Sequence, residues 1–353
     1  MINVVGILNY SKEQLIQMFN SINLPKFRVI QVLDWIYNNG CKSFNNMTNI
    51  NKELQELLSK SYYIYRPTII KTDKSTDGTI KFLLKLQDNN TIETVFIPEN
   101  NRNTICISSQ VGCAVGCKFC NTGYNGFKRN LTTEEIVSQV LIVKDYVNSW
   151  KIKDKIITNI VVMGMGEPLF NWNNVNIALQ NITIGKNQSI STKHITVSTS
   201  GIVPVLNKII DKFDYNLAIS IHAPNDEIRS NIMPINKIYP LKDLLNTCKI
   251  YNKLHKNKLI TFEYLMLNNI NDSEKNARQL IKLLHQIRCK VNLIKFNSWE
   301  GDIFTGSSME QIKYFQQILN KSGVTATIRC SKGQDIMAAC GQLQSQNNIK
   351  IIK

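Results

Sequence analysis

The side chains best suited to chemistry in this 353-residue chain are three cysteines in one short loop, Cys113-Ala-Val-Gly-Cys117-Lys-Phe-Cys120. Gly112 and Gly116 allow the tight bend that three thiolates need to converge on one centre. Structural zinc normally takes four ligands, and no histidine or fourth cysteine lies nearby in the sequence. Three thiolates instead suit a 4Fe–4S cluster whose fourth iron keeps an open site. Three buried structural cysteines, or an incomplete zinc site, are the alternatives.

The elements that must position this loop alternate between strands and helices from about residue 104 onward. Six strand-then-helix units in series predict an α/β fold with a parallel sheet. Right-handed crossovers favour a partial (β/α)6 barrel over a flat doubly wound sheet, which remains the alternative. In either fold, ligands gather at the carboxyl ends of the strands. The expected strands are 104–110, 156–163, 194–199, 216–221, 259–267 and 290–296, and the expected helices are 132–147, 172–182, 202–211, 240–255, 272–287 and 308–322.

Two smaller regions precede the barrel. Residues 1–64 form an expected helical accessory domain, in which Ser11 is the cap of the first helix. Residues 65–100 form an expected β extension, with turn signals at Asp77-Gly78 and Asn89-Asn90. Residues 101–353 then form the core and its C-terminal tail. Within the core, Thr132 with Glu135 three residues later predicts a capping box at a helix start.

The composition indicates an anionic partner. There are 42 basic and 26 acidic side chains, a formal net charge of +16, which favours nucleic acid, with a merely solvated basic surface as the alternative. No apolar run is long enough to span a membrane, and the N-terminus lacks the features of a secretory signal. We therefore expect a cytoplasmic protein. Nine cysteines in a reducing compartment indicate metal or redox chemistry rather than a disulfide framework.

The cysteine spacing after a first barrel strand resembles the radical S-adenosylmethionine superfamily, in which the open iron binds the methionine portion of the cofactor. The wider sequence resembles one of its families, the dual-specificity ribosomal- and transfer-RNA adenine-C2 methyltransferases. The matching segments span nearly the whole chain: CISSQVGC from Cys106, CKFCNTGYNGFKRNLT from Cys117, GMGEPL at 164–169, VSTSG at 197–201, SIHAPND at 220–226, MPINKIYP at 233–240 and AACGQL at 338–343.

The resemblance implies a 4Fe–4S cluster held by the three loop cysteines and two molecules of S-adenosylmethionine in each turnover. It also assigns cofactor contacts at or just beyond the carboxyl ends of the expected strands. A glycine-rich turn there lets the backbone approach a ligand closely. The implied cofactor-binding residues are Gly166, Glu167, Ser198, Ser220, Ile221, His222 and Asn297.

The implied reaction makes 2-methyladenosine at adenine 2503 of 23S ribosomal RNA and adenine 37 of transfer RNA. Because adenine C2 is electron-poor, transfer of an electrophilic methyl group fails there, whereas a carbon radical can add. By resemblance, Cys340 is first methylated, and its S-methyl group then loses a hydrogen atom to the deoxyadenosyl radical and adds to C2. Cys106 attacks the Cys340 sulfur, forming a transient disulfide and releasing the product. Glu93 corresponds to the proposed proton acceptor for the C2 hydrogen.

The remaining assignments concern partners and alternatives. The implied partners are 23S ribosomal RNA, transfer RNA and an electron donor such as flavodoxin; we expect a monomer and no membrane contact. Cys41, Cys248, Cys289 and Cys330 match no reactive position. The alternative functions are a related adenine-C8 methyltransferase, a non-catalytic iron–sulfur RNA-binding protein or sensor, and a structural zinc protein. Basic side chains that could grip RNA phosphates are Lys26, Arg28, Lys42, Lys128 and Arg129.

Overall fold

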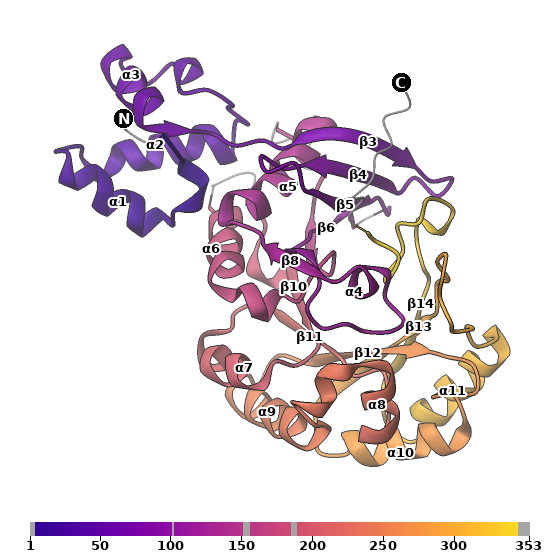
Figure 1. Ribbon diagram of the computed structural model, residues 1–353. Coiled ribbons are helices and arrows are strands. Elements are labelled where there is room, and N and C mark those ends of the chain that lie inside the picture. The colour runs from indigo at the N-terminus through magenta and orange to yellow at the C-terminus, as the bar shows by residue number, and fades with distance from the viewer. Residues whose placement is uncertain (1–3, 101, 151–155, 185–188, 345–353) are drawn as a thin grey trace.

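A computed structural model describes residues 4–100, 102–150, 156–184 and 189–344, so the last nine residues of the expected tail lie outside the described part. The N-terminal unit comprises three helices and two short parallel strands: α1 (Lys12–Ser21), α2 (Lys26–Tyr37), α3 (Lys52–Ser61), β1 (Val5–Gly6) and β2 (Tyr62–Tyr63). Ser11 caps α1 with a full capping box, as the sequence predicts. Figure 1 shows this unit, in indigo, set to one side of the remaining molecule.

The centre of the molecule is one ten-stranded sheet, ordered β14-β13-β12-β11-β10-β9-β6-β5-β4-β3. Strands β3 to β6 pair antiparallel, and β6 to β14 pair parallel. The strands are β3 (Thr68–Lys74), β4 (Ile80–Lys85), β5 (Thr91–Ile97), β6 (Thr104–Cys106), β9 (Asn159–Val162), β10 (Ile195–Thr199), β11 (Asn216–Ser220), β12 (Ile260–Met266), β13 (Cys289–Lys295) and β14 (Ala326–Arg329).

The parallel part confirms the expected α/β fold and excludes the doubly wound alternative. In a doubly wound sheet the strand order reverses at a switch point. Here the order runs in one direction from β6 to β14, and the sheet stays open at both edges, as in a partial barrel. Figure 1 shows helices packed around this curved sheet: α5 (Thr133–Tyr146), α6 (Trp172–Ile182), α7 (Val203–Ile209), α8 (Asp226–Ile232), α9 (Leu241–Leu254), α10 (Glu274–Leu284) and α11 (Met309–Lys321). The short helix α4 (Asn121–Tyr124) belongs to the segment between β6 and β9.

Three details differ from the sequence prediction. The expected strand 104–110 is two strands, because the chain leaves the main sheet after β6 and forms β7 (Gln110–Gly112), which pairs with β8 (Phe127–Asn130). Helices α4 and α8 were not predicted. A seventh parallel strand, β14, follows α11; it is a partly buried edge strand without the apolar run that marks β9 in the sequence.

The predicted turns and caps of the core are confirmed. Thr132 and Glu135 form the capping box of α5. Gly78 and Asn89 adopt positive φ angles of 86° and 66° at the two turns of the β3–β5 meander. Among the described residues, no helix has the length and apolar character needed to cross a membrane.

Candidate active site

The three loop cysteines lie in the wall of one cavity of about 170 Å³. Strands β7 and β8 frame the loop, and the N–H of Cys113 donates to the carbonyl of Gly126 at 2.9 Å. Gly112 is required there, because its φ is 75° and a Cβ would lie 1.9 Å from the Gly126 oxygen. Cys120 is followed directly by the short helix α4. The local fold therefore presents three thiols, from one tight loop, to one space.

The donor set fits a cluster better than a single ion. Among the described residues, no three His, Cys, Asp or Glu side chains are placed to hold one metal ion. A zinc ion needs all its sulfur ligands about 2.3 Å from one point, whereas a 4Fe–4S cluster binds each thiolate to a different iron. Burial raises the pKa of Cys113 to about 12 and that of Cys117 well above its usual value. A bound cationic centre would offset that penalty.

Most of the expected cofactor residues line the same cavity as the three cysteines. They are Gly166, Glu167, Ser198, Ser220 and His222, contributed by the loops and strand ends after β9, β10 and β11. Gly166 has a φ of 103°, and a Cβ there would lie 2.6 Å from the Cβ of Gln110, so only glycine fits. Residues from three successive strands thus converge at the carboxyl edge of the sheet, where the fold places ligands.

Two expected cofactor residues are placed differently. Ile221 is fully buried and absent from the cavity wall, and its carbonyl accepts the Nε–H of Arg229 at 3.1 Å. Asn297 is also buried, but its amide donates to the carbonyl of Cys340 at 3.4 Å and accepts from Gln334. Asn297 therefore holds the C-terminal tail, and its cofactor contact remains a prediction.

Glu167 fixes the shape of this cavity. Its carboxylate accepts hydrogen bonds from the hydroxyl of Thr199 at 2.7 Å and from both the hydroxyl and the N–H of Ser200 at 2.7 Å. It also accepts from the N–H of Leu169. Burial raises the pKa of Glu167, while these donors oppose the shift by stabilising the charged form. Glu167 therefore ties the loop after β9 to the loop after β10.

His222 is held as a neutral ring in an unusual backbone conformation. Its φ is 53°, and its Nδ1 accepts the N–H of Leu265 at 3.0 Å. Burial lowers its pKa to about 3. The ring packs edge-on against Phe119, the residue before Cys120, with centroids 5.0 Å apart. His222 thus connects the cluster loop with β12 and presents an uncharged imidazole to the cavity.

The sequence prediction missed Arg229, on α8. This side chain is fully buried and donates to the carbonyls of Ser200 and Ser220 at 2.7 and 3.1 Å. Its Nη1 also donates to the side-chain oxygen of Asn236 at 2.8 Å. Burial lowers its pKa to about 10. Arg229 therefore locks the ends of β10 and β11 beside the cluster loop; the only sequence signal is its place shortly after the SIHAPND segment.

Cys106 and Cys340, far apart in the sequence, lie in the wall of one larger cavity of about 490 Å³. Cys340 and Cys120 line both this cavity and the smaller one. Burial, followed by the charge of Cys340, raises the pKa of Cys106 to about 12. All nine cysteines are free, so no disulfide joins the pair in this structure. The fold brings the two expected reactive thiols to one space that meets the cofactor cavity.

The tail that carries Cys340 is tied to the β extension. The Gly333 N–H donates to Asp77 at 3.0 Å, and Asp335 accepts from the hydroxyl of Ser75 at 2.6 Å. Lys81 donates to the carbonyl of Met337 at 3.3 Å. Beyond Cys340, helix α4 also holds the tail. The Asn121 N–H donates to the carbonyl of Gly341, and the Thr122 hydroxyl donates to the carbonyl of Leu343. The 65–100 region is therefore part of the active-site scaffold.

Glu93, the expected proton acceptor, belongs to this anchor. It is 2% exposed, pairs with Lys81 at 3.0 Å and accepts the Gln344 N–H at 2.9 Å. Burial raises its pKa, and Lys81 opposes that shift. Glu93 is in the wall of neither cavity described above. Its position beside the tail is clear, whereas its role in proton transfer remains a prediction.

Two of the basic side chains expected at the RNA interface are already paired within the protein. Arg129 contacts Asp88 at 2.6 Å and Glu135 at 2.8 Å. Lys42 contacts Asp145 at 3.1 Å. These ion pairs reduce the charge that both residues could offer to phosphates.

Comparison with known proteins identifies two regions. Residues 5–64 match the family model described as the ribosomal RNA large subunit methyltransferase N-terminal domain, and residues 107–281 match the radical SAM superfamily. The chain is 43% identical over 350 residues to the dual-specificity RNA methyltransferase RlmN of Paracoccus denitrificans, covering 97% of this chain and 90% of that protein. It is 45% identical over 338 residues to RlmN of Sinorhizobium medicae, covering 91% and 82%.

A solved structure agrees with these sequence matches. The radical SAM methyltransferase from Sphaerobacter thermophilus superposes with a TM-score of 0.90 at 37% identity, covering 96% of this chain and 99% of that one. The chain belongs to the RlmN family of radical SAM RNA methyltransferases.

Proposed function

We propose that this chain methylates C2 of adenine in both 23S ribosomal RNA and transfer RNA, at adenines 2503 and 37, through an S-methyl group on Cys340. The observation that carries the proposal is the shared cavity wall of Cys106 and Cys340, joined through Cys340 to the cavity of the three loop cysteines. The curated relatives named dual-specificity RNA methyltransferase support the two RNA classes.

The residues present fit a 4Fe–4S cluster with S-adenosylmethionine. Cys113, Cys117 and Cys120 would hold the cluster, and the other groups of the small cavity would hold the cofactor, twice in each turnover. When bound, the two supply a transferable methyl group and a carbon radical able to remove hydrogen from an otherwise inert methyl group. Glu167 and Arg229 keep the strand ends in place, and the neutral imidazole of His222 adds no charge beside the cofactor.

The chain's own part of the reaction lies with its two free thiols. Cys340 accepts the methyl group and carries its carbon to the adenine, so that the RNA becomes covalently attached to the tail. Cys106 then attacks the Cys340 sulfur, and the resulting disulfide releases the methylated RNA. Glu93 accepts the proton from C2. The target adenine must leave its stack to reach a cavity inside the protein, as base-modifying enzymes generally require.

The further partners follow from this chemistry. A one-electron donor of the flavodoxin class would supply the reducing electron, and a reductant would reset the Cys106–Cys340 disulfide. The net charge of +16 supports binding to RNA phosphates. We place the enzyme in the cytoplasm, acting as a monomer.

Product analysis tests the proposal. Anaerobically reconstituted enzyme is incubated with unmodified 23S ribosomal RNA or transfer RNA, S-adenosylmethionine and a reductant, and the nucleosides are analysed by mass spectrometry. We expect 2-methyladenosine from both RNAs. An 8-methyladenosine product would contradict the C2 assignment, and retention of methyl transfer by Cys340→Ala would contradict the carrier role.

A further inference from the structure

Tyr124 is the most exposed aromatic side chain of the described residues, with 72% of its surface accessible. It is the last residue of α4, the short helix that directly follows Cys120. Single apolar side chains are common on protein surfaces and need no partner. The support beneath the Tyr124 ring and the position of its helix distinguish this residue from such cases.

The ring of Tyr124 rests on a rigid support. It packs against Trp299, with the ring centroids 5.3 Å apart and the planes inclined at 51°. Trp299 is buried, and its Nε1–H donates to the carbonyl of Phe119 at 3.3 Å. Its backbone N–H donates to Asp302 at 2.7 Å. The tyrosine is therefore held from one side, and the opposite face of its ring is open to a ligand.

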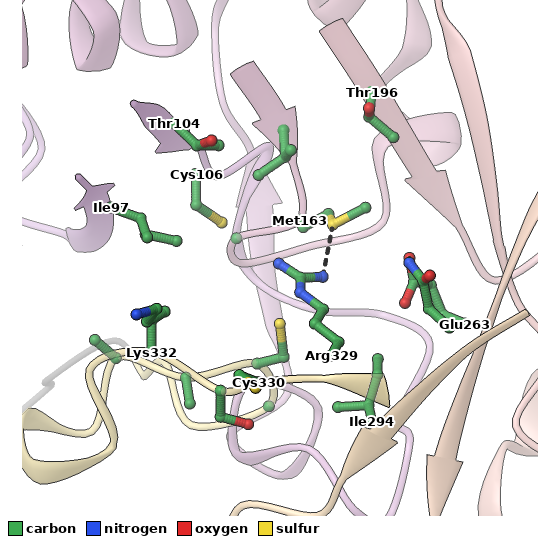
Figure 2. Close-up of a pocket in the computed structure, with 18 of the residues that line it drawn as sticks. Ile97, Thr104, Cys106, Met163, Thr196, Glu263, Ile294, Arg329, Cys330 and Lys332 are labelled. Atoms are coloured by element: carbon green, nitrogen blue, oxygen red, sulfur yellow. Dashed lines mark hydrogen bonds between the residues drawn. The ribbon is translucent and has the colours of Figure 1, made fainter. Parts of the chain in front are cut away.

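Helix α4 also belongs to the wall of the larger cavity. Thr122 lines that cavity together with Cys106 and Cys340. Figure 2 shows the Cys106 side chain pointing into this space. The Asn121 N–H and the Thr122 hydroxyl hold the tail just beyond Cys340. One short helix thus carries both a residue of the cavity wall and, at the molecular surface, the exposed ring of Tyr124.

We propose that Tyr124 stacks against an unpaired base of the substrate RNA, the base of the nucleotide next to the target adenine. This inference rests on the proposed function. When the adenine leaves its stack to enter the cavity, the neighbouring base loses a stacking partner. An exposed aromatic ring can replace that partner, because every base offers a π face whatever its sequence. Proteins commonly recognise unpaired RNA bases by such stacking.

The charges near Tyr124 fit an RNA strand on one side of the ring. Residues 113–130 include three basic side chains and no acidic one. Two of the basic side chains, Lys118 and Lys128, are exposed. The turn at 299–302 instead carries two acidic residues. Because phosphates are attracted to basic side chains, the RNA backbone follows the side of the cysteine loop.

RNA binding by the reconstituted holoenzyme tests this role. Unmodified transfer RNA is titrated anaerobically without S-adenosylmethionine, so that no methyl transfer occurs, and the dissociation constant is measured. Tyr124→Phe keeps the ring, Tyr124→Leu keeps an apolar side chain without a π face, and Tyr124→Ala removes both. Tyr314→Ala is the matched control, because Tyr314 is an exposed tyrosine on α11 that lines neither cavity. Iron content reports folding of each variant.

Tyr124→Ala should weaken RNA binding by about fivefold or more, which corresponds to the loss of one base–aromatic stack. Tyr124→Phe and Tyr314→Ala should stay within about twofold of the unmodified protein. The affinity of Tyr124→Leu should lie between those of the Phe and Ala variants. Unchanged affinity in Tyr124→Ala, or equal losses in the Phe and Ala variants, would overturn the proposal.

Transfer RNAs with an abasic site locate the stacked base. One RNA lacks the base on the 5′ side of the target adenine, and the other lacks the base on the 3′ side. On the RNA without the stacked base, Tyr124→Ala should change the affinity by less than about twofold, because the stack is already lost. A full further loss of affinity on both abasic RNAs would overturn the assignment to a neighbouring base.

A separate measurement addresses a competing occupant, an electron-donor protein. Unchanged RNA affinity in Tyr124→Ala, together with slower reduction of the cluster by flavodoxin, would assign the ring to that donor and overturn the RNA assignment. If the unmodified enzyme methylated no RNA, the proposed function would fail, but the RNA affinities would still decide the role of Tyr124.

Discussion

The carboxylate of Glu93 accepts the backbone N–H of Gln344 at 2.9 Å, although 251 positions separate the two residues in the sequence. Glu93 belongs to β5 of the β extension, and Gln344 lies four residues beyond Cys340. The same carboxylate pairs with Lys81, which in turn donates to the carbonyl of Met337. One buried ion pair thus holds the tail on both sides of Cys340.

Glu93→Gln should therefore impair the tail as well as any proton transfer. The amide keeps the shape but leaves Lys81 buried without a counter-charge, which costs about 3 kcal/mol in the free energy of unfolding. We expect a lower unfolding midpoint in denaturant and faster proteolysis between residues 331 and 344. Methylation of Cys340 before RNA is added should also decline.

The control for this prediction is Asp335→Asn, which alters a tail contact at the surface instead of the buried pair. It should change the unfolding midpoint little. If Glu93→Gln left stability, proteolysis and methylation of Cys340 unchanged and blocked only the later RNA steps, Glu93 would be a proton acceptor without an anchoring role.

Glu167→Ala should disrupt the cofactor cavity. The substitution removes the acceptor for Thr199, Ser200 and Leu169, and buried donors left unpaired cost about 1–3 kcal/mol each. Binding of S-adenosylmethionine, measured by equilibrium dialysis with reconstituted enzyme, should weaken by about tenfold or more. Glu167→Gln retains one carbonyl acceptor, so its affinity for S-adenosylmethionine should lie between those of Glu167→Ala and the unmodified protein. Equal affinity in all three proteins would show that this hydrogen-bond network does not shape the cavity.

The neutral state of His222 predicts a specific pH dependence of stability. Its pKa is about 3 in the folded protein against 6.5 for the free side chain. Below pH 6.5 the His222 side chain binds a proton in the unfolded chain but stays neutral in the folded protein. This histidine therefore lowers the free energy of unfolding as the pH falls from 6.5 toward 3. His222→Asn should show a smaller loss of unfolding free energy between pH 7 and pH 5, because asparagine tolerates the positive φ and does not titrate there.

The comparison is made by urea unfolding of both proteins at each pH. Subtracting the pH-dependent change in unfolding free energy of the variant from that of the unmodified protein removes the contribution of the other titrating side chains. Parallel losses in the two proteins would mean that His222 is not held neutral.

Cluster binding should depend on the three loop cysteines alone. Replacement of Cys113, Cys117 or Cys120 by Ala should remove most of the bound iron and sulfide and abolish methyl transfer, since in the proposed site each thiolate would ligate a separate iron. Cys289→Ser is the control, because Cys289 starts β13 and lines neither cavity. Full iron content in any of the three loop variants, measured after anaerobic reconstitution, would refute the assigned ligand set.

The sequence predicted the alternating core well because each buried strand and amphipathic helix leaves a local pattern. Strand β12 and helix α6 were located within one residue at each end. The cysteine loop was found for the same reason: its chemistry is contained in eight consecutive residues. Strand β14 was missed, since this edge strand is only partly buried and lacks the apolar run that marks β9, a strand of the same length.

Other features depend on contacts between distant segments, which no local pattern encodes. The hydrogen bond from the Gln344 N–H to Glu93 and the hydrogen bond from Arg229 to the Ser200 carbonyl are of this kind. The hydrogen bond from the Asn297 amide to the Cys340 carbonyl is another contact of this kind, and the expected cofactor contact of Asn297 stays a prediction. Contacts of this type are decided by tertiary packing and emerge only from the folded chain.

The most direct test of the whole account is the behaviour of Cys106→Ala with RNA. If Cys340 carries the methyl carbon and Cys106 releases the product, this variant should stop with RNA covalently attached to the protein. Electrophoresis under denaturing conditions, followed by mass spectrometry of the cross-linked peptide, should locate the bond at Cys340. The double variant Cys106→Ala/Cys340→Ala should form none. Free 2-methyladenosine from Cys106→Ala at the normal rate, without any adduct, would contradict the account.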